Sequence, residues 1–490
     1  MRALRLLAIV LALAIALLAA RAVTLPSRQI AVPPAPRLAL DEAAIVERFA
    51  ASIRFPTIST STDPATVPVA DFQAFQRWLA ESYPRLHGSL TLERVSEHSL
   101  LYTWPGTNPA LEPVILLAHQ DVVPAADEAR WTHPPFAGAV ADGFVWGRGT
   151  IDDKSAVVAT CEAVELLLAR GFAPARTVML AFGHDEEVGG AHGAQQIVTL
   201  LASRGVRAAF VIDEGLAIVT GGAVPLLDRP AALVGIAEKG SVTLEVIAKA
   251  AGGHSSTPPR TTAAGILARA IQRIEASPFP GGIGPVTGGF FEFLAPELPF
   301  VARVPLGNLW LFGKPLDWAL SRSPAGNALL RTTTAVTMLS GSPKENVLPS
   351  QAVATVNFRI LPGDTTESVL GYVRDLVAGD EVEVRFKGPG RDPSPVSPTD
   401  TPAFALLHRT IEEVFPDAVV APGLVLGGTD SRHFSEITPN VYRFAPFRYD
   451  GDDLKRPHGI DERMSIEGYL DGVRFYVRLL ENASGAFEAP

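Results

Sequence analysis

Cysteine is almost lacking, since Cys161 is the only one in 490 residues. A single cysteine excludes an intramolecular disulfide framework and any zinc site built on cysteine pairs. Cys161 lies in an apolar, helix-like stretch, so we expect it to be a small core residue. The chain also lacks a His-Glu-x-x-His motif, which disfavours a peptidase with one zinc ion held by a single helix.

Basic clusters are lacking as well. The net charge is -10 at pH 7, and no run of lysine and arginine is interleaved with aromatic residues, so we expect no nucleic-acid partner. Only 19% of the residues are charged and 47% are hydrophobic, which excludes a disordered chain. At this length we expect two or more domains with cores of their own.

A long apolar run, residues 6–20, follows Arg2 and Arg5 at the start of the chain. Its length suits the core of a signal peptide and is short for a bilayer span, and Ala20-Arg21-Ala22 offers a cleavage site. Residues 1–25 are therefore predicted to be a signal peptide or, alternatively, an N-terminal membrane anchor, and the proline-rich residues 26–39 a linker. Either interpretation predicts a protein that is exported to the periplasm or the extracellular space, or attached to the membrane by its N-terminus.

Five short polar clusters interrupt sequence that is otherwise apolar and strand-like or helical. They are His119-Gln120-Asp121, Asp152-Asp153, Asp185-Glu186-Glu187, Asp213-Glu214 and Pro457-His458-Gly459. The first four follow or end apolar runs, so the pattern predicts that strand ends deliver carboxylates and imidazoles to one edge of an α/β sheet. So many neighbouring carboxylates would be desolvated beside like charge unless cations neutralise them.

These clusters resemble the M20 family of co-catalytic zinc metallopeptidases, in particular the branch with carboxypeptidase S-like enzymes and secreted N-acyl-amino-acid hydrolases. The motifs occur in the family's order and are His-x-Asp, Gly-x-Gly-x-x-Asp-Asp-Lys, Asp-Glu-Glu-x-Gly-Gly, Gly-Gly-His-Ser-Ser and Gly-Gly-Thr-Asp-Ser-Arg. The resemblance covers nearly the whole chain after the first forty residues. It implies an α/β fold, with a zinc-peptidase-like three-layer α/β/α catalytic domain and an inserted smaller α+β lid or dimerisation domain.

A change of pattern near residue 233 marks the expected start of the inserted domain. Strand-like alternation, as at Val242, Leu244 and Val246, is followed by a helix and further strands. The predicted domains are the catalytic domain at 40–233 and 389–490 and the inserted domain at 234–388, with an extra insertion at about 278–331. Proline, glycine and aromatic residues break the pattern in that extra insertion.

The resemblance implies two Zn²⁺ ions, with Co²⁺ or Mn²⁺ as substitutes, that share a bridging carboxylate. The expected ligands are Asp152 as the bridge, His119 and Asp213 on one ion, and Glu187 and His458 on the other. We expect the neighbouring Glu214 and Asp153 to support the ligands or to face solvent. The peptide bond between Asp152 and Asp153 is expected to be cis.

Further residues match family positions that act on the substrate or on the ligands. Glu186 resembles the general base that takes a proton from water and passes it to the leaving amine, and Asp121 would fix the orientation of His119. His254 resembles the histidine that hydrogen-bonds the developing oxyanion. The residues expected to bind the substrate's carbonyl and carboxylate are Asn346, Arg359 and Gly428. An exposed arginine on an edge strand is the alternative for Arg359.

The sequence thus predicts an enzyme, a dinuclear zinc hydrolase that cleaves an amide bond adjacent to a free carboxylate, as a carboxypeptidase or dipeptidase on short peptides. The alternative is an N-acyl-amino-acid hydrolase, with an acyl pocket lined by aromatic residues that would otherwise pack in the core or lid. They are Phe290, Phe291, Phe293, Trp310, Phe312 and Trp318. A non-catalytic binding protein on the same fold is a distant third hypothesis. A homodimer through the inserted domain is also expected.

Overall fold

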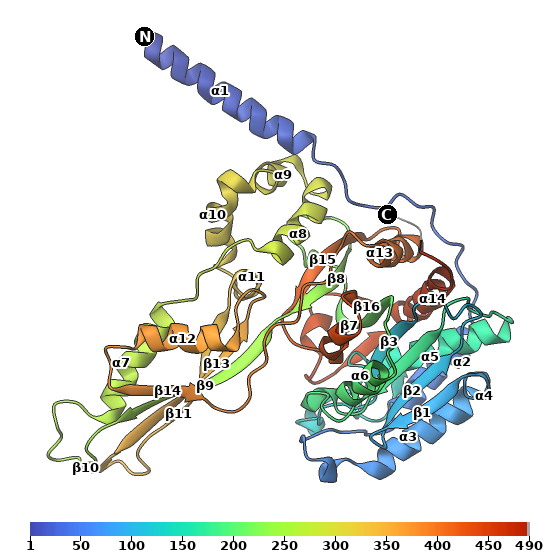
Figure 1. Cartoon of the computed structure of the whole chain (residues 1–490), viewed down its shortest axis with the longest axis horizontal. Helices are drawn as coiled ribbons and strands as arrows, with labels where there is room; N and C mark the ends of the chain where they lie inside the picture. The colour runs from blue at the N-terminus through green and yellow to red at the C-terminus, as the bar shows by residue number, and fades with distance from the viewer. Residues whose placement is uncertain (488–490) are drawn as a thin grey trace.

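The larger of two main β-sheets organises the fold. The computed structural model describes residues 1–487, and eight of its strands lie in the order β1-β2-β6-β3-β7-β16-β8-β15 (Figure 1). Their bounds are β1 Thr91–Val95, β2 Ser99–Trp104, β3 Val114–His119, β6 Val178–Gly183, β7 Phe210–Val219, β8 Ala231–Glu238, β15 Val419–Val425 and β16 Val441–Tyr449. Strands β6, β3, β7 and β16 pair in parallel, whereas β1 and β2 add an antiparallel edge.

Helices cover both faces of this sheet. They are α2 Glu42–Ser52, α3 Val69–Ser82, α4 Pro84–Ser89, α5 Lys154–Ala169, α6 Ala194–Ser203, α13 Pro402–Val414 and α14 Ile466–Ala483. On β3, Leu116 packs into the core formed with α5 and α14, whereas Ile115 and Leu117 pack into a separate core with α6. Alternate residues of a strand point to opposite faces, and both faces of β3 are covered, so the strand is apolar up to its last residue, His119. The expected three-layer α/β/α catalytic domain is confirmed, and Cys161 is buried within α5 as predicted.

A smaller antiparallel sheet lies beside the first, in the order β11-β13-β9-β14. The bounds are β9 Gly240–Lys249, β11 Thr333–Ser340, β13 Gln351–Ile360 and β14 Val382–Phe386, and two helices, α7 Ala263–Ala276 and α12 Thr366–Leu376, cover one face. Residues Val242, Leu244 and Val246 of β9 form a separate core with these helices, as expected for the inserted α+β domain. Since β8 belongs to the larger sheet and continues to Glu238, the predicted boundary at residue 233 falls inside this strand.

Two short pieces complete the β structure. Strands β10 Gly253–His254 and β12 Val347–Leu348 pair at the tip of the smaller sheet, at the lower left of Figure 1. Strands β4 Ala139–Ala141, β5 Phe144–Trp146 and β17 Arg463–Ser465 form a three-stranded sheet. The strand β17 thereby joins the C-terminal part of the chain to the loop that leads into α5.

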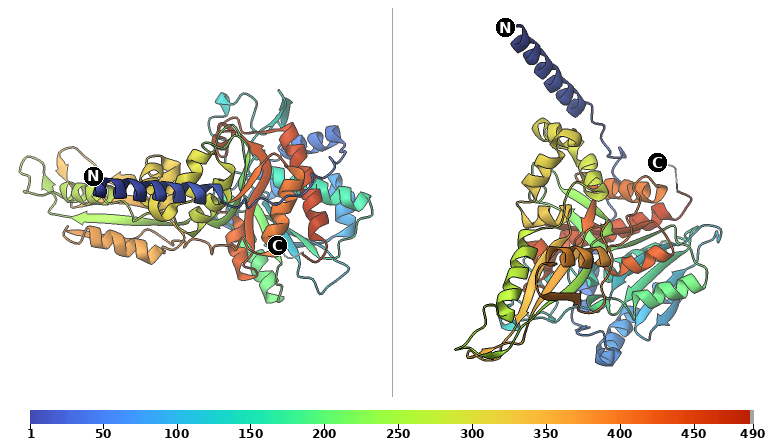
Figure 2. Two further views of the ribbon diagram at one scale, coloured as in Figure 1. Left: turned by 90° about the horizontal axis from the view of Figure 1, so that it is seen from above. Right: turned by 60° about the vertical axis from the view of Figure 1, so that its left-hand side comes forward.

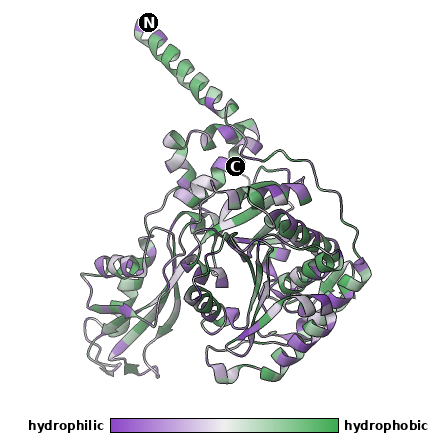
Figure 3. Ribbon diagram, turned by 45° about the vertical axis from the view of Figure 1, so that its right-hand side comes forward, coloured by the Kyte–Doolittle hydropathy of each residue, from purple (hydrophilic) through white to green (hydrophobic). Residues whose placement is uncertain are grey.

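Between α7 and β11 lies a helical insertion, defined here as residues 285–330. Its helices are α8 Pro285–Leu294, α9 Phe300–Leu306, α10 Leu309–Leu320 and α11 Pro324–Leu330. Helix α8 packs on β15, whereas α9 lies at the foot of the N-terminal helix α1, Arg2–Val23, and α10 packs on α9 (Figures 1 and 2). Helix α1 projects away from the rest of the chain and is apolar along most of its length (Figure 3). Its length and composition would allow it to cross a membrane.

Candidate metal centre

The predicted polar clusters meet at one edge of the larger sheet. His119 is the last residue of β3, the 3-10 turn Glu186–Val188 follows β6, and Glu214 lies within β7. Because β6, β3 and β7 are parallel neighbours, their carboxyl ends reach the same edge. Asp152 comes from the loop before α5 and His458 from the loop after β16, so segments remote in sequence converge here.

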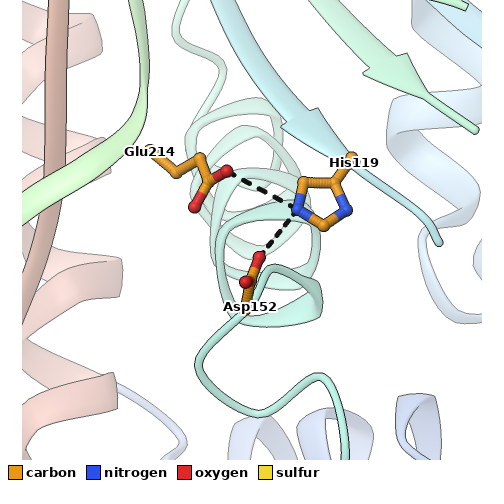
Figure 4. A group of neighbouring side chains, drawn as sticks. All are labelled: His119, Asp152 and Glu214. Atoms are coloured by element: carbon orange, nitrogen blue, oxygen red, sulfur yellow. Dashed lines mark hydrogen bonds and ion pairs between the residues drawn. The ribbon is translucent and has the colours of Figure 1, made fainter. Parts of the chain in front are cut away.

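Asp152 lies between two groups of candidate ligands. Its Oδ1 is 2.8 Å from Nε2 of His119, and Oε1 of Glu214 is 3.7 Å from the same nitrogen (Figure 4). Its Oδ2 is 3.1 Å from Nε2 of His458, which is also 3.1 Å from Oε2 of Glu187. Within each group, the candidate ligand atoms lie within 4.8 Å of one another. The two groups therefore share Asp152, with one of its oxygens facing each group.

Strand β7 brings Glu214, rather than the predicted Asp213, to His119. The carboxylate of Asp213 instead accepts hydrogen bonds from the backbone N–H groups of Ser431, at 2.7 Å, and of Glu214, at 2.9 Å. Successive residues of a strand point to opposite sides, so one of the two adjacent carboxylates is turned away from the cluster. The ligand expected from the motif was Asp213, and the residue that lies beside His119 is Glu214. The motif alone does not reveal which of the two faces His119.

Glu462 holds the loop that carries Asp152. Its buried carboxylate accepts hydrogen bonds from the backbone N–H groups of Ile151, at 2.7 Å, and Asp152, at 3.2 Å, and lies 2.5 Å from Nη1 of Arg148. The peptide bond between Asp152 and Asp153 is cis, which confirms that expectation. Glu462 was not predicted, because nothing in the sequence links it to a loop about three hundred residues earlier.

Asp121 connects the imidazole of His119 to the segment that carries Glu186. Its backbone oxygen is 2.9 Å from Nδ1 of His119, and its Oδ1 is 3.3 Å from the same nitrogen. Its carboxylate also accepts hydrogen bonds from the backbone N–H groups of Glu186 and Glu187, both at 3.2 Å. The imidazole therefore presents Nε2 to Asp152, in the orientation that was predicted to depend on this aspartate.

Burial shifts the pKa values of the clustered groups. Burial, with Asp152 close by, raises the pKa of Glu214 to about 8. Burial also raises the pKa of Glu186 well above its ordinary value, against the opposing effect of His119. Hydrogen bonds to Asp152 and Glu187 raise the pKa of His458 to about 10. These shifts are the response of an acidic cluster whose charge the protein's own cations do not balance.

The donor atoms of the cluster suit a divalent cation such as zinc. Imidazole nitrogens and carboxylate oxygens are ligands that zinc takes, and three protein ligands leave a coordination position for water or substrate. One oxygen of Glu187, Oε1, is buried and has no hydrogen-bond partner among the described residues. The residues around Asp152 therefore fit a metal centre, with one group of ligands on each side of the shared carboxylate.

Two of the predicted substrate-contacting residues lie away from this cluster within a single chain. His254 belongs to β10 and Asn346 directly precedes β12, so both lie at the tip of the smaller sheet (Figure 1). Both are exposed, and the backbone oxygen of Asn346 accepts a hydrogen bond from Ser255 at 3.2 Å. Nδ1 of His254 is 2.7 Å from Oγ of Ser256. The structure brings these two residues together, but not to the metal centre of their own chain.

The other two predicted residues, Gly428 and Arg359, lie near an arginine that was not predicted. A side chain on Gly428 would collide with the guanidinium of Arg391, which packs against the glycine backbone. Burial and the charges of Arg432 and Arg359 lower the pKa of Arg391, and Glu238 and, less strongly, Glu186 act in the opposite direction. The guanidinium of Arg391 has no hydrogen bond or ion pair with the part of the chain that is described. Arg391 was missed because it lies at the start of the predicted second part of the catalytic domain and belongs to no motif.

Comparison with known proteins identifies the family. The sequence profile of peptidase family M20/M25/M40 matches residues 115–482. The probable carboxypeptidase S-like 2 of Dictyostelium discoideum is 40% identical over 445 residues, which cover 90% of this chain and 86% of that protein. The N-fatty-acyl-amino acid synthase/hydrolase PM20D1.1 of Danio rerio is 41% identical over 445 residues, which cover 90% of this chain and 85% of that protein.

Among solved structures, the M20 family metallo-carboxypeptidase Sso-CP2 from Sulfolobus solfataricus matches with a TM-score of 0.63. The match covers 90% of this chain and 99% of that chain at 18% sequence identity. At so low an identity the likeness concerns the fold, and it agrees with the pair of sheets described above.

Proposed function

The chain belongs to peptidase family M20/M25/M40 and is a hydrolase, and on that premise we propose that it cleaves an amide bond next to a free carboxylate with the help of two zinc ions. The observation that supports this proposal is the shared carboxylate of Asp152, which faces His119 and Glu214 on one side and His458 and Glu187 on the other. The proposed substrate is a short peptide, cleaved as by a carboxypeptidase or dipeptidase.

The proposed chemistry divides between the metal and the protein. Zinc bound by these residues would polarise a carbonyl oxygen and lower the pKa of water. Glu186 is the proposed general base, because it is half-buried beside the cluster and its raised pKa suits both accepting and returning a proton. Asp121 is proposed to keep Glu186 and His119 in a fixed relation, since it contacts the backbone of one and the ring of the other.

The test is to separate metal binding from proton transfer. The purified chain should contain two zinc ions, and Glu186→Gln should keep both while its kcat falls by about 10²- to 10⁴-fold. The matched control is Glu275→Gln, at an exposed position of α7, which should change neither quantity. Full hydrolysis by Glu186→Gln, or a wild-type chain that is active without any metal, would refute the proposal.

Arg391 is proposed to bind the free carboxylate of the substrate, together with Arg359 and the backbone of Gly428. The guanidinium is half-buried beside Gly428 and has no partner among the described residues, and a planar guanidinium can grip a carboxylate at two points. Arg391→Gln should lower kcat/KM by about 10- to 100-fold, since hydrogen bonds to charged groups stabilise by about 1.5–3 kcal/mol. Arg385→Gln, at an exposed ion pair on β14, should leave kcat/KM unchanged.

A second substrate distinguishes a role of Arg391 in binding the substrate from a role in supporting the loop. If Arg391 binds the carboxylate, Arg391→Gln and the wild type should have equal kcat/KM on a substrate whose terminal carboxylate is amidated. Neither protein can then form the contact between the guanidinium and the carboxylate. An equal loss on both substrates would show that Arg391 supports the loop rather than the substrate.

An N-acyl-amino-acid hydrolase is the second proposed function. It is favoured by the 41% identity to a protein named an N-fatty-acyl-amino acid synthase/hydrolase. The aromatic residues of the helical insertion do not line one pocket, because Phe291 and Phe293 are buried whereas Trp310 and Trp318 are exposed. An acyl chain would therefore bind elsewhere. Comparing kcat/KM for a dipeptide and for a long-chain N-acyl amino acid separates the two functions.

His254 is proposed to act in the metal centre of a second copy of the chain, in a dimer formed through the smaller sheet. The exposed position of His254 at the tip of that sheet supports this proposal. Mixing His254→Ala with Glu186→Gln chains, each inactive alone, should restore about a quarter of the wild-type activity per chain, because half of random dimers are mixed and each holds one complete site. No recovery in mixed dimers isolated by two affinity tags would refute it.

A further inference from the structure

Helices α9 and α10 carry exposed apolar residues that the described chain covers only in part, since the guanidinium carbon of Arg322 lies 4.1 Å from the ring centroid of Trp318. Its residues are exposed by 47% at Phe300, 82% at Val301, 68% at Trp310, 47% at Leu311 and 63% at Trp318. None of the twelve residues of α10 is buried, although the helix contains only one lysine and one aspartate. We call these five residues the apolar face. Exposed apolar residues that lie together mark a contact surface.

The position of the apolar face relative to α1 identifies what covers it. Asn308, between α9 and α10, is almost fully buried, and its side chain donates a hydrogen bond to the backbone oxygen of Leu18 at 3.2 Å. Ala22, near the C-terminal end of α1, is fully buried, and Leu25 lies close to Gly307. Figure 1 shows α9 at the C-terminal end of α1, and α10 packs against α9. The apolar face is therefore attached to one end of a helix that could span a membrane.

The dimensions place this attachment at the membrane boundary. With 22 residues, α1 is about 33 Å long, which matches a hydrocarbon thickness of about 30 Å. If α1 spans the bilayer, Leu18 lies within about 8 Å of the end where the chain leaves the hydrocarbon. The loop at Asn308 then lies at the boundary between the hydrocarbon and the lipid headgroups, where tryptophan is enriched in membrane proteins.

The charged groups near the apolar face agree with this location. Lys314 is exposed on α10 and can extend its ammonium toward lipid phosphates. The carboxylate of Asp317 lies 2.8 Å from Nη2 of Arg331, so it is neutralised within the protein. Neither indole N–H of the two exposed tryptophans has a hydrogen-bond acceptor in the described chain, which leaves both free to reach lipid carbonyls or water.

We propose that α9 and α10 lie on the outer surface of the bilayer that α1 spans, with the apolar face inserted between the lipid headgroups. The enzyme is then attached at two points, and its catalytic sheet is held at a fixed orientation above the membrane rather than on a loose tether. The proposal requires α1 to remain part of the mature chain. It does not depend on the proposed substrate.

Fluorescence of the full chain, reconstituted into phosphatidylcholine and phosphatidylglycerol vesicles, tests this proposal. Lipids brominated close to the headgroup should quench part of the tryptophan emission, and Trp310→Phe with Trp318→Phe should remove most of that quenched part. Trp78→Phe is the matched control, since Trp78 packs against Phe75 in the catalytic domain, and it should leave the quenched part unchanged. Equal quenching of all three proteins would overturn the proposal.

A second variant tests the contact between the apolar face and the lipid without removing the fluorescent tryptophans. Val301→Asp with Leu311→Asp keeps both tryptophans but charges the apolar face, so quenching should fall while circular dichroism stays unchanged. If the apolar face instead joins two copies of the chain, quenching will be absent in the wild type and the charged variant will alter the oligomeric state. That result would overturn the membrane contact.

Discussion

Two groups of charged side chains lie close together at the larger sheet, and they differ in how their charge is balanced. At the end of β8, Oε1 of Glu238 accepts hydrogen bonds from Thr429, from Ser431 and from Nε of Arg443, the last at 2.8 Å. Around Asp152, three carboxylates surround two imidazoles. The first group contains its own counter-charge, whereas the second has an excess of acid.

Because of this difference, the pKa values of the carboxylates in the two groups are shifted in opposite directions. Burial acts to raise the pKa of Glu238, but Arg443 and the Thr429 hydroxyl outweigh it, so the pKa lies below the ordinary value. For Glu214, burial and the neighbouring Asp152 act in the same direction and raise the pKa to about 8. A buried carboxylate whose ionised form is stabilised by other groups of the protein is thus structural. A buried carboxylate whose ionised form the protein destabilises is a candidate for binding a cation.

The largest effect is expected from removing the shared carboxylate. Asp152→Asn should lose zinc from both groups of ligands and hydrolyse no substrate, because each group depends on one oxygen of Asp152. Zinc content measured by mass spectrometry, together with kcat/KM, checks this. Glu238→Gln is the comparison and should retain its zinc when folded. An Asp152→Asn chain with two tightly bound ions would break the distinction between the groups.

The next largest effect separates the two adjacent carboxylates of β7. Glu214→Gln should weaken zinc binding by more than 100-fold, roughly, whereas Asp213→Asn should weaken it by about 10- to 100-fold, the range typical of residues that support a ligand. Competition with a chelator measures both affinities. The reverse order would show that Asp213 binds the metal and would restore the assignment expected from the motif.

The adjacent residues Asp213 and Glu214 also show how much of the site could be predicted from the sequence alone. Apolar runs that end in His119, Asp152 or Glu187 predicted a sheet edge rich in ligands, since hydrophobic periodicity and chain order are local properties. Which face of β7 presents a carboxylate depends on strand register, which neighbouring strands determine. For the same reason, Glu462 and Arg391 could not be assigned, because their roles depend on contacts between remote segments.

The positions of His254 and of the helical insertion could not be predicted from the sequence, for a different reason. The motifs predicted His254 as a residue of the site, but they do not say whether its side chain would reach the site of its own chain or of another copy. The aromatic residues of the insertion could equally have been core or surface, and the structure divides them, with Phe293 buried and Trp310 exposed. Composition does not distinguish these outcomes.

A moderate effect on stability is expected from a substitution in the group around Glu238, whose charge is balanced by Arg443. Glu238→Gln should lower the free energy of unfolding by about 3–5 kcal/mol, because it leaves the guanidinium of Arg443 buried without its partner. Chemical denaturation of the zinc-loaded protein measures this loss. Glu383→Gln, which removes an exposed ion pair with Lys249, is the matched control and should leave the denaturation midpoint unchanged. Equal midpoints for both variants would mean that the Glu238 network is not structurally important.

The smallest effect, a shift in the pH dependence of stability, compares the two groups directly. In metal-free protein, the raised pKa values of Glu214, about 8, and His458, about 10, mean that the folded state binds more protons than the unfolded state. Their contribution to stability should therefore fall as the pH rises from about 4.5 toward 10. The lowered pKa of Glu238 acts in the opposite sense, since its contribution is lost only as the pH falls below about 4.5.

Thermal unfolding between pH 5 and pH 9, with and without a chelator, tests this difference in sign. The chelated protein should lose stability as the pH rises, and zinc should flatten or reverse that trend, because bound cations favour the ionised carboxylates and the neutral imidazoles. The Glu238 network should contribute no slope in this range, so Glu238→Gln should shift both curves without changing their shape. A zinc-independent slope would mean that the carboxylates around Asp152 are not balanced by metal.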